Sequence, residues 1–255
     1  MGMGGSKPDF SNKIGTGMMP PSDMELEIDA DMSMLDLRLK RLDKLPWDLS
    51  VLTNLQELDL SMNLYTMLPD QCIWKGGHLA TSLTKLSINQ NRITQMPDEI
   101  REMKRLHTLC CYDNTLTCLP KTIHEIENLT QLSVYNNFIT ELPEEFIKMP
   151  KLEMAFFSNN RIAKLPEGME QLTSLRGLFL DGNQLQELPE GFTGMTNLRE
   201  LTLANNLLKG VPEDLTKLSS LTELYLNGAC GNRTVVIPEP VARMGCLKDC
   251  YEGQI

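Results

Sequence analysis

The stretch LTQLSVYNNFITELPEEFIKM, residues 129–149, combines two hydrophobic periods in one short unit. Leu132 and Val134 are separated by one residue, which is the period of a strand. Phe146 and Met149 follow Pro143 and are three residues apart, which is the spacing of one helical face. The stretch therefore predicts a short strand, a turn, and then a short helix or 3-10 segment.

The Leu-Pro pair of this unit belongs to a series of nine similar pairs along the chain. They are Leu45-Pro46, Leu68-Pro69, Met96-Pro97, Leu119-Pro120, Leu142-Pro143, Leu165-Pro166, Leu188-Pro189, Val211-Pro212 and Ile237-Pro238. The step is 23 residues except for one of 28 and a last one of 26. One unit cannot bury its apolar side alone, so the repeats must stack on each other. The series predicts an α/β solenoid with a concave parallel sheet and short convex helices or 3-10 segments.

Three regions follow from where the repeat begins and ends. Residues 1–31 have no hydrophobic period and are rich in acids, glycine and proline, so they are predicted to be a disordered N-terminal arm. Residues 32–246 form the solenoid of nine repeats, and residues 247–255 a short C-terminal cap. Insertions around residues 74–78 and 228–232 explain the two longer steps. They are either loops without a role or extra contact surface.

A unit such as LRGLFLDGNQLQELP, residues 175–189, resembles the intracellular leucine-rich repeats of 23 residues found in Ras-group, Ras-suppressor and Scribble-type proteins. The resemblance covers residues 32 to about 250 and implies a leucine-rich repeat horseshoe. It also implies an adaptor role, in which the protein partner is a small GTPase, a phosphatase or a kinase. The arm contains no basic-Val-x-Phe motif of the kind that some phosphatase-binding members use.

Composition excludes several classes of function. The net charge of −10 argues against nucleic acid as a partner, because binding to phosphates requires a basic surface. No stretch is long and apolar enough to span a bilayer. Seven cysteines without a C-x-x-C pair, and a start that does not read as a secretory signal, predict a reducing, cytoplasmic setting. The three histidines lie far apart, so we expect no catalytic residues, no metal and no cofactor.

An asparagine recurs where each predicted strand turns. Its amide can bond backbone groups that a tight turn leaves unpaired, so we interpret this column as a structural ladder. Its members are Asn63, Asn91, Asn114, Asn137, Asn160, Asn183 and Asn206.

Aromatic residues concentrate on the predicted concave face, in positions that alternate with the buried strand leucines. Exposed apolar patches mark interaction sites, and tyrosine and phenylalanine are frequent anchors there. The predicted partner-binding residues are Tyr112, Tyr135, Phe138, Phe156, Phe179 and Tyr225. The alternative is that these rings pack on each other across neighbouring strands and only stabilise the sheet.

The chain opens with MGMGGS, which fits the N-myristoylation pattern M-G-x-x-x-[ST] with Gly2 as the acceptor. One acyl chain binds membranes only marginally, so the hypothesis is reversible association with the cytoplasmic face of a membrane. Together these features predict a non-enzymatic adaptor in intracellular signalling that binds a protein on its concave face. The alternatives are a structural subunit of a cytoskeletal or ciliary assembly and a regulatory subunit of a partner enzyme.

Overall fold

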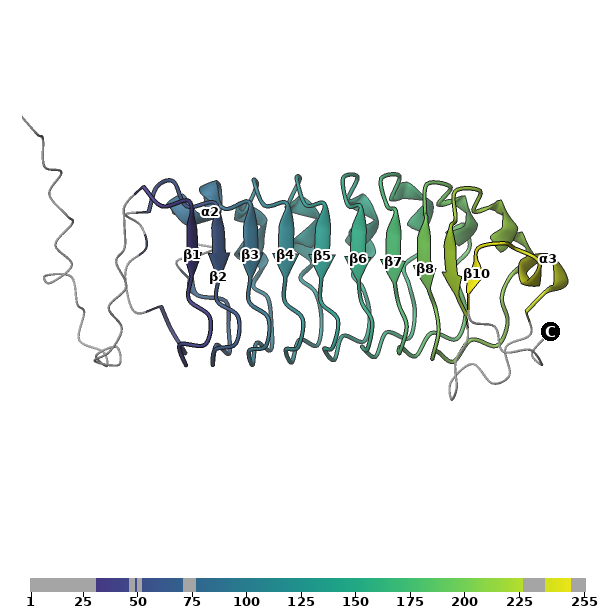
Figure 1. Cartoon of the computed structure of the whole chain (residues 1–255), viewed down its shortest axis with the longest axis horizontal. Coiled ribbons are helices and arrows are strands. Elements are labelled where there is room, and N and C mark those ends of the chain that lie inside the picture. Colours follow the sequence, from purple (N-terminus) through teal and green to yellow (C-terminus); the bar gives the residue numbers. More distant parts are fainter. Residues whose placement is uncertain (1–30, 46–48, 50–51, 71–76, 227–236, 249–255) are drawn as a thin grey trace, which may run out of the picture.

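Ten short strands form one parallel sheet in which each strand pairs with the next one along the chain (Figure 1). The computed structural model describes residues 31–45, 49, 52–70, 77–226 and 237–248. The strands are β1 (Met34–Asp36), β2 (Glu57–Asp59), β3 (Lys85–Ser87), β4 (Thr108–Cys110), β5 (Gln131–Ser133), β6 (Met154–Phe156), β7 (Gly177–Phe179), β8 (Glu200–Thr202), β9 (Glu223–Tyr225) and β10 (Leu247–Lys248).

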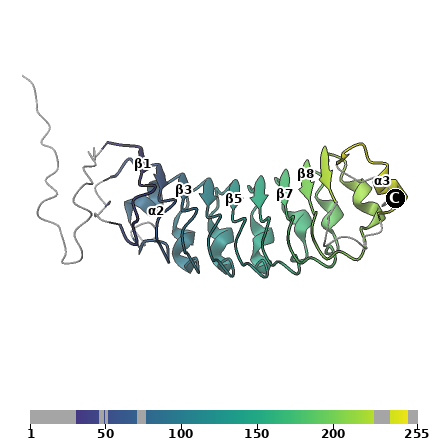
Figure 2. The same ribbon diagram turned by 60° about the horizontal axis from the view of Figure 1, so that its bottom comes forward.

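Short helical segments cover the opposite side of the sheet, and the strands line the inside of a shallow curve (Figure 2). The helices are α2 (His78–Ser82) and α3 (Glu239–Ala242), and the 3-10 segments are η3 (Asp98–Glu102), η4 (Lys121–Glu125), η5 (Glu144–Lys148), η6 (Met169–Gln171), η7 (Phe192–Gly194) and η8 (Glu213–Lys217). The proline of the Leu-Pro pair precedes η3, η4, η5 and η8 as the residue at the N-cap. Its fixed φ suits the approach to a helical turn, which ends the extended segment there.

One continuous core runs through the described solenoid. The central residue of each strand from β1 to β9 is buried and pairs with its equivalent in the next strand. This residue is leucine in every strand but β6, where it is Ala155. Near this small residue the core holds Phe146 and Phe157, whose rings meet edge to face at 5.5 Å. The repeats thus bury together the apolar side that no single repeat could cover.

The 28-residue step does not disturb the register of the sheet. Leu58 pairs with Leu86 as in the regular repeats, and the Asn91 amide still donates to Leu60 O at 3.0 Å. The extra residues are therefore accommodated on the way from Asp70 to α2, and residues 71–76 of that path lie outside the described part. The second insertion, residues 228–232, lies outside it as well. So do the predicted arm up to residue 30 and the predicted cap beyond Lys248.

Candidate interaction surface

The asparagines of the predicted ladder lie at the end of the strands and are buried. The Asn137 Nδ2 group donates to the carbonyl oxygens of Val134 and Tyr135 in its own repeat and of Cys111 in the preceding one, at 2.9, 3.2 and 3.0 Å. Its Oδ1 accepts from the Leu116 N–H at 2.9 Å. The other members bond in the same pattern. Each side chain therefore joins two neighbouring repeats through backbone groups.

Not every position that alternates with the buried leucines reaches solvent. The sequence pattern assigns Ser61, Ser87, Asn89 and Ser133 to the exposed concave face, but all four are buried at 5 or 6% exposure. Adjacent strands lie only about 4.8 Å apart, so a small side chain is covered by larger neighbours on both sides. Ser133, for example, lies between Cys110 and Phe156 in the sheet.

Four of the six predicted partner-binding rings form two stacks on the concave face. Tyr112 and Tyr135 stack with centroids 4.4 Å apart and planes 8° from parallel, and Phe156 and Phe179 do so at 4.6 Å and 8°. Phe156 pairs with Ser133, two residues before Tyr135, so the stacks lie on consecutive repeats. All four rings are half-buried. The rings thus pack on each other, as the alternative interpretation expects, and they also leave an accessible aromatic surface. We call this surface, formed by these four rings, the aromatic platform.

The other two predicted rings lie apart from the stacks. Phe138 is exposed at 40%, on the loop that follows β5, and the guanidinium of Arg161 covers its ring at 4.5 Å from the centroid. Tyr225 lies on β9 and is separated from Phe179 on β7 by Thr202 on β8. Its hydroxyl donates to Glu223 at 3.2 Å. The structure therefore places Phe138 at the edge of the surface and Tyr225 outside the aromatic platform.

A carboxylate that the sequence reasoning did not single out lies beside the platform. Asp181 Oδ1 accepts hydrogen bonds from the hydroxyls of Ser158 and Thr202, at 2.7 and 2.5 Å. Two donors from neighbouring repeats fix this carboxylate, which follows Phe179 by two residues and shares its face of the sheet. The same alternation that found the rings contains this signal, because Asp181 occupies the next concave position after Phe179.

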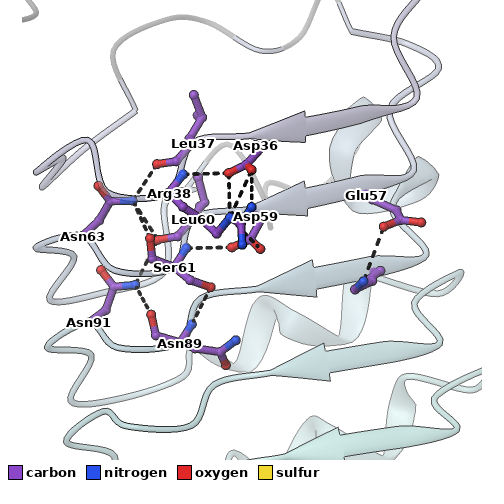
Figure 3. A network of polar contacts seen from close by, with 11 residues as sticks. Asp36, Leu37, Arg38, Glu57, Asp59, Leu60, Ser61, Asn63, Asn89 and Asn91 are labelled. Atoms are coloured by element: carbon purple, nitrogen blue, oxygen red, sulfur yellow. Dashed lines mark hydrogen bonds and ion pairs between the residues drawn. The ribbon is translucent and has the colours of Figure 1, made fainter.

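The start of the concave face is polar and internally paired (Figure 3). Arg38 forms a bidentate contact with Asp36, with its shortest distance at 2.6 Å, and lies 3.7 Å from Asp59. The hydrogen bond from the Arg38 side chain lowers the pKa of Asp36. Glu57 and Lys85 form a further pair at 3.5 Å. These charges are paired with each other, so this end offers a weaker anchor than the platform does.

The region around the platform also affects two ionisable groups. Burial raises the pKa of Tyr135 to about 12, and the neighbouring Tyr112 adds to the shift. Burial likewise raises the pKa of the half-buried Cys110 thiol, which leaves less of the nucleophilic thiolate. Among the described residues, no three His, Cys, Asp or Glu side chains form a group that could hold a metal ion.

The repeated units match a known family. The model of the leucine rich repeat family matches residues 127–185 and 189–230. The matched residues are leucine-rich repeats, and the chain has the fold of a leucine-rich repeat solenoid. This solenoid is in general a module for binding rather than catalysis, and its partner is set by the residues on its surface. The family match does not distinguish the 23-residue class of repeats or the Ras-suppressor group from other leucine-rich repeats.

Solved leucine-rich repeat proteins have the same architecture. A leucine-rich repeat protein of Leptospira interrogans is 28% identical, with a TM-score of 0.61 over 86% of this chain and 66% of the other. The plant peptide hormone receptor RGFR1 in complex with RGF2 is 26% identical, with a TM-score of 0.67 over 81% of this chain and 33% of the receptor. An internalin of Listeria monocytogenes is 28% identical, with a TM-score of 0.60 over 69% and 49%. The chain thus spans at most about two thirds of these proteins.

Comparison with curated protein sequences gave no match. In the part of the leucine-rich repeat chain that the structure describes, no helix is long and apolar enough to cross a membrane.

Proposed function

We propose that this leucine-rich repeat protein is a non-enzymatic adaptor that binds a protein partner through the aromatic platform of its concave face. The observation that carries the proposal is the pair of ring stacks, which leaves four aromatic side chains half-exposed on consecutive repeats. Rings held in stacks lose little conformational entropy when a partner covers them, which suits them as anchors. The receptor RGFR1, solved in complex with RGF2, supports a protein ligand in general terms.

The chemistry around the platform indicates what the partner presents. An apolar or aromatic side chain would cover the rings, and a lysine or arginine next to it would meet the carboxylate of Asp181. Because Ser158 and Thr202 hold that carboxylate in place, a cation that reaches it gains a charge-assisted hydrogen bond. A positively charged partner also suits a chain with a net charge of −10.

The double variant Tyr135→Ala, Phe156→Ala tests the proposal, because it removes one ring from each stack. Affinity capture with proximity labelling should lose one dominant partner, while the circular dichroism spectrum stays that of the wild type. The control variant Met67→Ala, Leu207→Ala also truncates two exposed apolar side chains, but away from the platform. It should retain the partner. Retention by both variants would contradict a concave binding site, and unfolding of the first would make the rings structural.

The cellular setting is the second part of the proposal. We place the adaptor in the cytoplasm and in signalling, with a small GTPase, a phosphatase or a kinase as the class of partner that the repeat resemblance implies. Gly2 lies outside the described residues, and its N-myristoylation rests on the sequence pattern alone. Mass spectrometry of the N-terminus from a eukaryotic host should find a myristoyl group. An unmodified or acetylated terminus would remove the membrane association from the proposal.

A further inference from the structure

A polar groove of about 260 Å³ lies at the other edge of the sheet, where strands β6 to β8 begin. It is distinct from the asparagine ladder, which lies where the strands end. Arg176 and Arg199 line this groove and directly precede β7 and β8. Thr173, Ser174 and Ser220 contribute hydroxyl groups to the same lining.

The two arginines are held next to each other by the sheet. Gly177 pairs with Glu200 across β7 and β8, and the Arg199 N–H donates to Arg176 O at 2.7 Å. Both side chains are exposed, and within the described part of the chain neither guanidinium has a carboxylate within ion-pair distance. Like charges directly opposite each other in a sheet repel. An anion bound between the two guanidinium groups would attract both of them and offset this repulsion.

The rest of the lining adds further donors. Within the described residues, the hydroxyls of Ser174 and Ser220 make no hydrogen bond to the chain. The Asn197 side chain donates to Thr173 O at 2.8 Å and thereby ties together the rim of the groove. Glu153 is the one carboxylate in the lining and opposes an anion. Two guanidinium groups and three hydroxyls against this single carboxylate leave the groove with an excess of positive charge and of hydrogen-bond donors.

From this arrangement we infer that the groove binds a phosphate monoester, carried as a phosphoserine or phosphothreonine by the protein partner. Such a group has a charge of about −1.5 to −2 and three acceptor oxygens, which match two arginines and the hydroxyls better than a carboxylate does. Nucleic acid is disfavoured, since its other phosphates would meet the acidic remainder of the molecule.

The placement of the groove relates it to the aromatic platform, and in this respect the inference rests on the proposed function. Arg176 directly precedes β7 and lies three residues before Phe179 at its end, and Glu153 and Phe156 are equally spaced about β6. At about 3.3 Å per residue, the backbone of the groove lining and that of the rings are about 10 Å apart along the strands. An extended partner segment that covers Phe156 and Phe179 can therefore place a phosphorylated residue about three positions away in the groove.

Titration of the isotope-labelled full chain with a short phosphoserine peptide, and with its unphosphorylated twin, tests the site by NMR. The phosphopeptide should shift the backbone amides of residues 173–177 and 197–200 saturably, and the twin should not. The variant Arg176→Gln, Arg199→Gln should weaken binding at least about tenfold. Glu153→Gln should strengthen it about twofold to fivefold, because it removes the opposing charge. The control Arg92→Gln, Arg105→Gln removes the same total charge elsewhere on the surface and should leave the affinity unchanged.

The outcomes separate this site from the platform. Equal binding of both peptides, or equal weakening by the control variant, would overturn the inference as non-specific. Binding of vesicles that contain a phosphoinositide, without binding of the phosphopeptide, would overturn the assignment to a protein partner. Loss of phosphopeptide binding in the arginine variant, with capture still abolished by Tyr135→Ala, Phe156→Ala, supports both sites. A partner that depends on the rings but ignores phosphate would refute the groove alone.

Discussion

Replacement of Asn137 by alanine should destabilise the protein strongly, although its side chain is buried beneath the surface that we propose for binding. Its side chain is 4% exposed, and both its amide group and its carbonyl oxygen bond to backbone groups. In the variant, the Leu116 N–H loses its acceptor, and the carbonyls of Cys111, Val134 and Tyr135 lose a donor. Water does not reach these groups readily, because the repeats on both sides cover them.

The magnitude follows from the number of bonds lost. The Asn137 amide has two donor hydrogens and one acceptor oxygen in use, and each satisfied position contributes about 1 kcal/mol net. The free energy of unfolding should therefore fall by about 3 kcal/mol. For a solenoid of this size, that corresponds to a decrease in melting temperature of about 6–12 °C.

Urea unfolding followed by circular dichroism measures this loss, provided that the slope of the transition stays unchanged. Asn205→Gly is the matched control, because Asn205 is exposed and has a φ of 54°, which glycine adopts without strain. The control should change the stability by less than about 0.5 kcal/mol. If Asn137→Ala unfolds at the wild-type midpoint, or the control loses as much, the ladder does not contribute in this way.

Three further predictions concern single ionisable groups. Burial raises the pKa of Cys110, so iodoacetamide at pH 8 should alkylate the exposed Cys118 several-fold faster, as peptide mass spectrometry can show. Arg38 lowers the pKa of Asp36 in the folded protein. The pair therefore stabilises the fold above pH 4, near the pKa of about 4 of an aspartate in the unfolded chain, and this stability is lost as the pH falls through the lower pKa of the folded protein. Asp36→Asn should flatten the fall in urea midpoint on acidification below that pH, and an unchanged acid dependence would contradict it. The pKa of Tyr135 is raised to about 12, so the neutral ring stabilises the fold up to about pH 10, and this contribution is lost as the pH rises towards 12. In ultraviolet titrations, the variant Tyr135→Phe should lack one tyrosine ionisation at high pH that the wild type shows, which assigns that ionisation to Tyr135.

The fold could be predicted from the sequence, because each repeat shows where its strand and its helical turn lie. Every Leu-Pro pair indicated a strand before it and a helical turn after it, and the structure has both in the described repeats. Ten strands in sequential order follow from stacking of units that cannot bury an apolar side alone. The 28-residue step was also readable as an insertion, since the pattern resumes after it in the same phase.

The exposed residues of the concave face could be predicted only in part. Alternation along a strand indicates which side a residue faces, and it placed Tyr135 and Phe156 on the concave face. Exposure depends in addition on the neighbours in the adjacent strands, which are 23 residues away in the chain. Ser87 and Ser133 occupy alternating positions of the same kind, yet they are buried.

The sequence by itself determined the repeat, the apolar ladder, the asparagine column and the face on which the rings lie, because these depend on periods within one unit. Only the tertiary structure decided which rings stack, that Asp181 is held by Ser158 and Thr202, and that Arg176 and Arg199 share a groove. These contacts join residues of different repeats. Their geometry is set by the stacking of the repeats, and no pattern within a single unit contains it.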